Sequence, residues 1–312
     1  MMRDLLKEWQ LELFEEYMVF RKRAASCAAS TQETIQAAIF SFFIYMNEHG
    51  ICSLADVSAP ALKDWHMTSP HSSARARNLY TAQLRLFFEY LEDRKMLLQP
   101  LSLALTHQSA PLTTIVEVFS PKQLEIVENY RLSASTPMEL RDAAMVMLGL
   151  KMGLRSVDIQ NLRIPDISWK KQTIAFEQQK TGVFVTLPMP TVVGNSLYRY
   201  IMEGRPKNDE CNQVFLSHMP PYDGLRQTVA IRRSLMHIFR HSDTGMPCGF
   251  HITRRTFASE LLRTGSPMPL IASALGHATV CNVNSYLSTD EKNLRKCAIG
   301  CDGISYKGAY GL

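Results

Sequence analysis

Two histidines, an arginine and a tyrosine form the most distinctive pattern of chemically active side chains in the chain. His251 and Arg254 are three residues apart at the predicted start of a helix, so that the two side chains share one helical face. A histidine and an arginine on one face can both address a single phosphate group. A later helix is predicted to end at Gly276, which lets His277 project into a cleft, and Tyr286 follows nine residues after this histidine.

The middle of the chain adds a guanidinium, a carboxylate and an amine. Arg155 follows a Gly-Leu pair just past a predicted helix, and Asp158 lies three residues further on. If this stretch is helical, Asp158 is close enough to orient Arg155. Lys180 stands beside a predicted hairpin turn. Each of these residue types, taken singly, is more often structural or solvated than catalytic, and only the complete set indicates a catalytic site.

The set as a whole resembles the phage integrase, or tyrosine recombinase, family. The matching strings are Gly-Leu-Arg-x-x-Asp, Lys-Thr-Gly, His-x-x-Arg-x-Thr-Phe-Ala and Leu-Gly-His, followed by the tyrosine nine residues on. The catalytic resemblance covers roughly residues 119–290, and the block 251–286 is its most specific part. One departure is Arg255, where the family often has histidine, so the choice of Arg254 depends on the His-x-x-Arg spacing.

The resemblance implies DNA cleavage through a covalent 3′-phosphotyrosyl link to Tyr286. A free tyrosine hydroxyl has a pKa of about 10, and it therefore needs help to lose its proton as it attacks. The phosphate gains negative charge on its non-bridging oxygens, and guanidinium groups suit this charge because each presents a planar fork of donors. Arg155 and Arg254 are the expected clamp, which would supply most of the stabilisation.

The family also implies a role for each remaining residue. His251 would accept the proton of Tyr286, while His277 would donate a hydrogen bond to the phosphate. Lys180 would protonate the leaving 5′-oxygen, and Asp158 would hold Arg155 or its short helix in place. The phosphoester bond energy is conserved in this scheme, so no ATP is needed. The sequence shows no cluster of carboxylates with metal-ligand spacing, and we expect neither a metal ion nor a cofactor.

The elements that must position these residues form two predicted domains. Helical periodicity extends over residues 4–22, 30–49, 53–65 and 72–91. This first unit loosely resembles the core-binding domain of the family. We predict a helical core-binding DNA-binding domain at 1–107, a linker at 108–118, a catalytic domain at 119–290 and a C-terminal tail at 291–312.

The second unit is predicted to contain a small sheet among helices. A helix begins near Ser120-Pro121 and another covers 139–152 before Gly153. Three short strands are expected at 167–169, 173–176 and 183–187, with a turn at Thr181-Gly182. The predicted fold is mainly α with a small antiparallel β-sheet in the catalytic domain, in a two-domain clamp.

Composition limits the class of protein and its location. The formal net charge of +5 fits a nucleic-acid partner but does not establish one. The seven cysteines contain no C-x-x-C pair, which favours reduced thiols in the cytoplasm over a disulfide framework or a zinc ribbon. The charged N-terminus does not resemble a signal peptide, and the most apolar run, 37–46, is too short to span a bilayer.

The resemblance also implies the partners. We expect double-stranded DNA at the nucleoid, a homotetramer on paired recombination sites, accessory DNA-bending proteins as a further option, and no membrane. In the tail, Leu294, Ala298 and, loosely, Cys297 form a small apolar stripe. The family favours docking of such a tail on a neighbouring protomer, while the stripe could also fold back on its own domain.

Three alternative readings stay open at this point. A type IB topoisomerase uses the same residues to relax supercoils as a monomer, although the small helical first unit argues against it. A DNA-binding accessory protein without catalysis is less favoured because all six catalytic positions are filled. An accidental match on a helical scaffold protein is the third. The sequence does not give the target site, nor does it separate an integrase or transposase of a mobile element from a resolvase or invertase.

Overall fold

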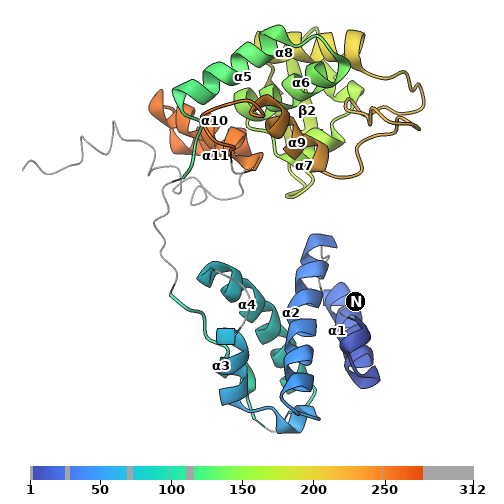
Figure 1. Ribbon diagram of the computed structural model, residues 1–312, viewed down its shortest axis with the longest axis vertical. Helices are drawn as coiled ribbons and strands as arrows, with labels where there is room; N and C mark the ends of the chain where they lie inside the picture. The colour runs from blue at the N-terminus through green and yellow to red at the C-terminus, as the bar shows by residue number, and fades with distance from the viewer. Residues whose placement is uncertain are drawn as a thin grey trace, which may run out of the picture. The chain divides into compact units, whose positions relative to one another are not determined.

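The computed structural model describes residues 3–24, 29–68, 73–97, 99–109, 116–247 and 249–276. The chain divides into two compact units, Met1–Leu112 and Thr113–Leu312 (Figure 1). The prediction of a mainly helical chain with one small antiparallel sheet is confirmed. The domain, linker and tail boundaries drawn from the sequence remain predictions.

The N-terminal unit is built from helices alone in its described residues. They are η1 (Arg3–Leu5), α1 (Glu8–Ala24), α2 (Ala29–Glu48), η2 (Leu54–Asp56), α3 (Ala59–Thr68), α4 (Ala74–Asp93) and η3 (Leu101–Ala104). The core between α2 and α4 is aromatic: Phe42 and Phe88 meet edge to face at 5.5 Å between ring centroids, as do Phe43 and Phe87 at 5.9 Å. Such pairs contribute packing energy beyond the area that they bury.

The C-terminal unit places helices around a three-stranded sheet. The helices are α5 (Pro121–Ser133), α6 (Pro137–Met152), α7 (Ser156–Asn161), η4 (Ile164–Asp166), α8 (Thr191–Arg199), the π-helical turn η5 (Tyr200–Gly204), α9 (Val229–Ile238), α10 (His251–Arg263) and α11 (Met268–Leu275). The strands β1 (Ile167–Ser168), β2 (Thr173–Glu177) and β3 (Phe184–Pro188) pair antiparallel in that order. Each strand boundary differs from the sequence prediction by no more than one residue.

Helix α6 is the centre of this unit, and α5, α8, α9 and α10 all pack against it. It begins two residues earlier than predicted because Thr136 caps it: the Thr136 side chain accepts from the Glu139 backbone N–H, and Pro137 takes the first helical position. It ends at Gly153, whose φ of +67° is left-handed. An added Cβ there would lie 2.5 Å from Phe257. The turn that follows α6 therefore requires glycine.

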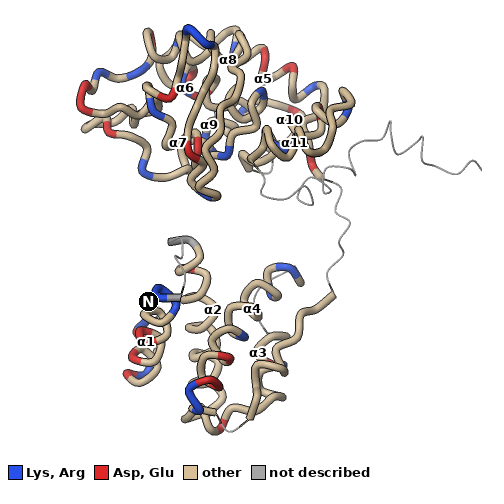
Figure 2. Tube along the Cα trace, turned by 180° about the vertical axis from the view of Figure 1, so that it is seen from behind, with Lys and Arg blue, Asp and Glu red and all other residues tan. Residues whose placement is uncertain are grey.

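Charged positions of both signs are interspersed along both units (Figure 2), in keeping with a modest net charge of +5. Among the described residues, no helix combines the length and the apolar character that a membrane span needs.

Candidate functional site

Arg155 lies in the short turn that joins α6 to α7. It is the N-cap residue of α7 and has an extended backbone. One terminal nitrogen, Nη1, donates to Gln178 Oε1 over 2.8 Å, and the other, Nη2, reaches the carbonyl oxygen of Gly276 at 3.4 Å. The side chain is 14% exposed. The guanidinium is thus held from two sides while part of it stays open to solvent.

Arg254 lies deeper in the same region. It sits in the first turn of α10 and is only 2% exposed. Its Nη1 donates to the carbonyl oxygen of Gly153 and its Nη2 to that of Leu275, both over 2.6 Å. These bonds tie three elements together, namely the end of α6, the start of α10 and the end of α11.

His251 is the first residue of α10, one turn before Arg254. The residue is exposed at the surface, yet surrounding protein removes enough water from the ring to disfavour its charged form. This burial, followed by repulsion from the positive charges of Arg254, Arg255, Arg155 and Lys180, lowers the pKa of His251 to about 4. The imidazole is therefore neutral at physiological pH and can accept a proton.

Lys180 is exposed in the turn between β2 and β3. Within the part of the chain that the structure describes, its ammonium group makes no hydrogen bond or ion pair. Its charge contributes to the lowered pKa of His251, so the two side chains belong to one electrostatic neighbourhood. An amine on an exposed turn is free to move toward a substrate.

Asp158 has a fully buried side chain near Arg155, and it binds the turn that carries Lys180. Its Oδ1 accepts from the backbone N–H of Gln179 over 3.0 Å, while its Oδ2 lies 3.9 Å from Arg155 Nη1. Burial raises the pKa of this carboxyl, and the hydrogen bond from Gln179 and the charges of Arg155 and Arg254 act in the opposite direction. Asp158 therefore contacts the lysine-bearing turn as well as Arg155 and its helix, and the sequence predicted only the link to Arg155 and the helix.

The structure thus brings five of the predicted residues together: Arg155, Asp158, Lys180, His251 and Arg254. The other two, His277 and Tyr286, lie outside the described residues. Sequence reasoning missed Gln178, whose buried amide joins Arg155 to the end of α11. A glutamine in a hairpin carries no sequence signal for such a role, because its partners are 23 and 97 residues away.

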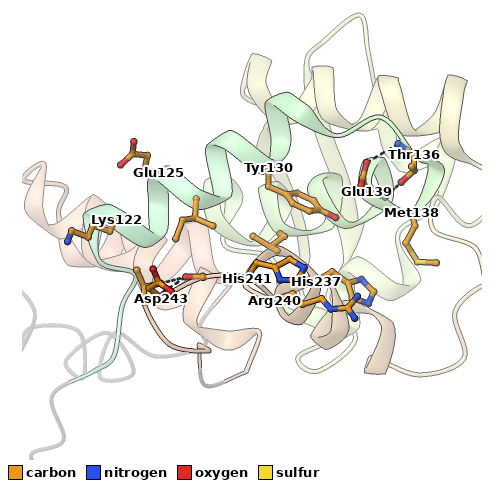
Figure 3. Close-up of a pocket in the computed structure, with 14 residues that line it drawn as sticks. Lys122, Glu125, Tyr130, Thr136, Met138, Glu139, His237, Arg240, His241 and Asp243 are labelled. Atoms are coloured by element: carbon orange, nitrogen blue, oxygen red, sulfur yellow. Dashed lines mark hydrogen bonds between the residues drawn. The ribbon is translucent and has the colours of Figure 1, made fainter.

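A cavity away from these residues also lies in the C-terminal unit (Figure 3). It measures about 1000 Å³ between α5, the start of α6, the end of α9 and the loop that follows α9. One of its lining residues, His237, bonds through Nδ1 to the buried carboxylate of Asp142 over 2.6 Å. None of the five described site residues, from Arg155 to Arg254, lines this cavity. Within the described ranges, no group of three or more His, Cys, Asp or Glu side chains is arranged to hold a metal ion.

Comparisons with known proteins identify relatives of this chain. A family model described as the phage integrase family matches residues 105–293. The putative integrase/recombinase y4gC of Sinorhizobium fredii is 34% identical over 168 residues, which cover 54% of this chain and 86% of that protein. The tyrosine recombinase XerD of Listeria monocytogenes is 27% identical over 313 residues, which cover 91% of this chain and 96% of that protein.

Solved structures share the fold. The XerH site-specific recombinase bound to a palindromic difH substrate superposes with a TM-score of 0.70 at 17% identity, covering 88% of this chain and 81% of that one. A lambda integrase dimer bound to a COC′ core site gives a TM-score of 0.69 at 15% identity, covering 97% and 99%. Because the family model spans more than half of the chain, and because y4gC matches over most of its own length, this chain belongs to the phage integrase family and is a site-specific DNA recombinase.

Proposed function

We propose that the recombinase cleaves one strand of duplex DNA by attack of the Tyr286 hydroxyl on a backbone phosphate. The tyrosine oxygen forms a bond to phosphorus, the bond to the 5′-oxygen breaks, and a 3′-phosphotyrosyl link and a free 5′-hydroxyl result. A 5′-hydroxyl of a second strand then attacks the link and reseals the backbone. The observation that carries this proposal is that Arg155 and Arg254 bind the carbonyl oxygens of adjacent residues, Gly276 and Leu275, while Lys180 and His251 lie close enough for their charges to interact.

The geometry supports a division of labour among these residues. Arg155 is partly open and fixed from two sides, so its remaining donors can meet a non-bridging oxygen without reorganisation. Arg254, which is more deeply buried, adds a second permanent positive charge beside Arg155. His251 is neutral, so a ring nitrogen has a free lone pair for the phenolic proton, and it is the proposed acceptor. Lys180, on its exposed turn, is the proposed acid for the leaving oxygen, and His277 is the proposed donor to the phosphate.

The proposal extends to the oligomeric state of the recombinase on DNA. Strand exchange between two sites requires four active centres, so we propose a homotetramer on paired duplex sites. The solved relatives named above are bound to DNA substrates, which supports duplex DNA as the partner here. Accessory DNA-bending proteins, a cytoplasmic location at the nucleoid, and a role in integrating a mobile element or in resolution belong to the same proposal.

An apolar groove beside the site offers a candidate acceptor surface for the C-terminal tail. The groove measures about 840 Å³ between β3, α10 and α11, and its lining includes Phe257, Leu261 and the exposed Phe184 and Leu270. Gly276 lies at its edge, and the chain continues from there to Leu312. We propose that the apolar stripe of a neighbouring protomer's tail, including its Leu294 and Ala298, occupies this groove.

The experiment that tests the function uses a nicked suicide substrate, which traps the covalent intermediate. The wild-type protein should form a protein–DNA adduct that survives a denaturing gel, and the Tyr286→Phe variant should form none. A plasmid without a recombination site serves as a control, because a topoisomerase would relax it while this enzyme should not.

A further inference from the structure

The side chain of Gln178 connects three parts of the site at once. It lies just after β2, two residues before Lys180, and is 2% exposed. Its Oε1 accepts from Arg155 Nη1 over 2.8 Å and from Thr181 Oγ1 over 2.9 Å. Its Nε2 donates to the carbonyl oxygen of Leu275 over 3.3 Å. Both ends of a buried amide are thus satisfied by groups around the site.

The backbone of Gln178 also shapes the turn that carries the lysine. Its N–H donates to the Val183 carbonyl over 2.9 Å, and its own carbonyl accepts from the Gly182 N–H over 2.8 Å. The side chain is packed so closely against Gly276 that an added Cβ there would lie 2.2 Å from the amide nitrogen. Gly276 is therefore glycine both for its φ of +58° and for the room that Gln178 needs.

Gln178 provides the short contact that fixes Arg155. Asp158, the nearby carboxylate, is 3.9 Å from the same Nη1, which is too far for a hydrogen bond. The contact with the Gly276 carbonyl is 3.4 Å, at the long end of the range. A hydrogen bond from a charged donor at 2.8 Å is the strongest of these three.

We propose that Gln178 is a positioning residue for strand cleavage, acting through Arg155. It holds the guanidinium in the orientation that meets the phosphate and links it to the Lys180 turn and the end of α11. The inference rests on the proposed role of Arg155 as a phosphate clamp. A misplacement of about 1 Å can cost about 100-fold in rate, so loss of this contact should slow cleavage by roughly 10- to 100-fold.

The test compares Gln178→Met with Gln179→Met in single-turnover formation of the covalent adduct. Methionine keeps the length of glutamine without its polar atoms. Gln179 is the adjacent, exposed glutamine, and only its backbone contacts Asp158, so its variant is the matched control. We expect the Gln178 variant to form adduct slowly, the Gln179 variant to match wild type, and both to bind DNA as wild type does in a gel shift.

A double-mutant cycle with Arg155→Ala isolates the route of the effect. If Gln178 acts through Arg155, Gln178→Met should slow the Arg155→Ala protein by less than about threefold, because the contact is already gone. A slowing as large as in the wild-type background, or a wild-type rate for Gln178→Met alone, would overturn the inference.

The variant Gln178→Glu covers the case in which methionine prevents folding. Glutamate keeps an oxygen for Arg155 and loses the donor to Leu275. We expect it to retain adduct formation within about tenfold of wild type, whereas a loss as complete as that of Arg155→Ala would contradict the inference. The proposed function fails separately, namely if Arg155→Ala itself cleaves at the wild-type rate.

Discussion

Arg254 Nη1 donates to the carbonyl oxygen of Gly153 over 2.6 Å. Gly153 ends α6 and lies two residues before Arg155, so one proposed clamp arginine holds the turn that carries the other. The second bond of Arg254, to the Leu275 carbonyl, extends this support to the end of α11, just before His277. The arginine thus combines a structural role with its proposed catalytic one.

This double role predicts different outcomes for the two arginines. Arg155→Ala and Arg254→Ala should each slow adduct formation by about 100- to 1,000-fold, as for other preorganised donors. DNA affinity should fall far less, because other phosphate contacts remain. Arg254→Ala alone should also lower the free energy of unfolding by on the order of 1–3 kcal/mol, since two buried carbonyls lose a partner. Chemical denaturation measures this difference.

Arg255 provides the control for that experiment. It follows Arg254 directly and is partly exposed. Arg255→Ala should leave cleavage close to the wild-type rate. If Arg255→Ala abolished cleavage and Arg254→Ala did not, the His-x-x-Arg assignment would be wrong.

A substrate with a better leaving group should make the proposed acid Lys180 unnecessary for cleavage. Lys180→Ala should cleave ordinary DNA slowly, because the departing 5′-oxygen needs a proton. A substrate with sulfur at the 5′-bridging position should restore the rate, since a thiolate leaves without one. Arg155→Ala should not be restored by the same substrate. Restoration of Arg155→Ala in place of Lys180→Ala would transfer the acid role to the arginine.

His251 should stay neutral well below the ordinary pKa of histidine. With a pKa near 4 in the folded protein, its ring should remain uncharged down to about pH 5. The ordinary pKa of histidine is 6.5. Between pH 6.5 and about pH 4 the unfolded chain therefore binds a proton at His251 that the folded chain does not bind. The contribution of His251 to folding stability falls as the pH drops through this window.

Histidine NMR of the full chain measures this titration directly, with His251→Gln to assign the resonance. A titration midpoint near pH 6.5 in the free protein would show that burial and the neighbouring positive charges do not lower the pKa of His251. Binding of DNA should raise the midpoint, because the phosphate offsets the charges of Arg155 and Arg254.

The sequence predicted the elements of the site better than the contacts within it. Apolar periodicity with the terminal Gly153 was enough to predict most of α6, and the strand pattern with the Thr181-Gly182 turn was enough to predict the β2–β3 hairpin, because these signals are local. The spacing of His251 and Arg254 likewise predicted a shared helical face. By contrast, the two carbonyls bound by Arg254 and the amide of Gln178 come from segments that are distant in the sequence. They come together because α10 packs against both α6 and α11, and because the side chain of Gln178, from the β2–β3 hairpin, reaches Arg155 and the end of α11.

The C-terminal tail should control assembly without controlling DNA binding. Truncation after Asp290 should leave affinity for a single site nearly unchanged, weaken cooperative binding to paired sites and abolish strand exchange. Leu270→Asp, which places a charge in the exposed part of the proposed acceptor groove, should reproduce the loss of cooperativity in the full-length chain. Normal cooperativity and recombination in both variants would mean that other surfaces drive assembly.

Formation of the covalent adduct tests the central claim most directly. The full-length protein and its Tyr286→Phe variant are incubated with the same nicked suicide substrate, and protein–DNA adducts are separated on a denaturing gel. The account predicts an adduct with wild type, none with Tyr286→Phe, and unchanged adduct with Tyr306→Phe and Tyr310→Phe. An adduct of undiminished yield from Tyr286→Phe would contradict it and would assign the nucleophile to another residue.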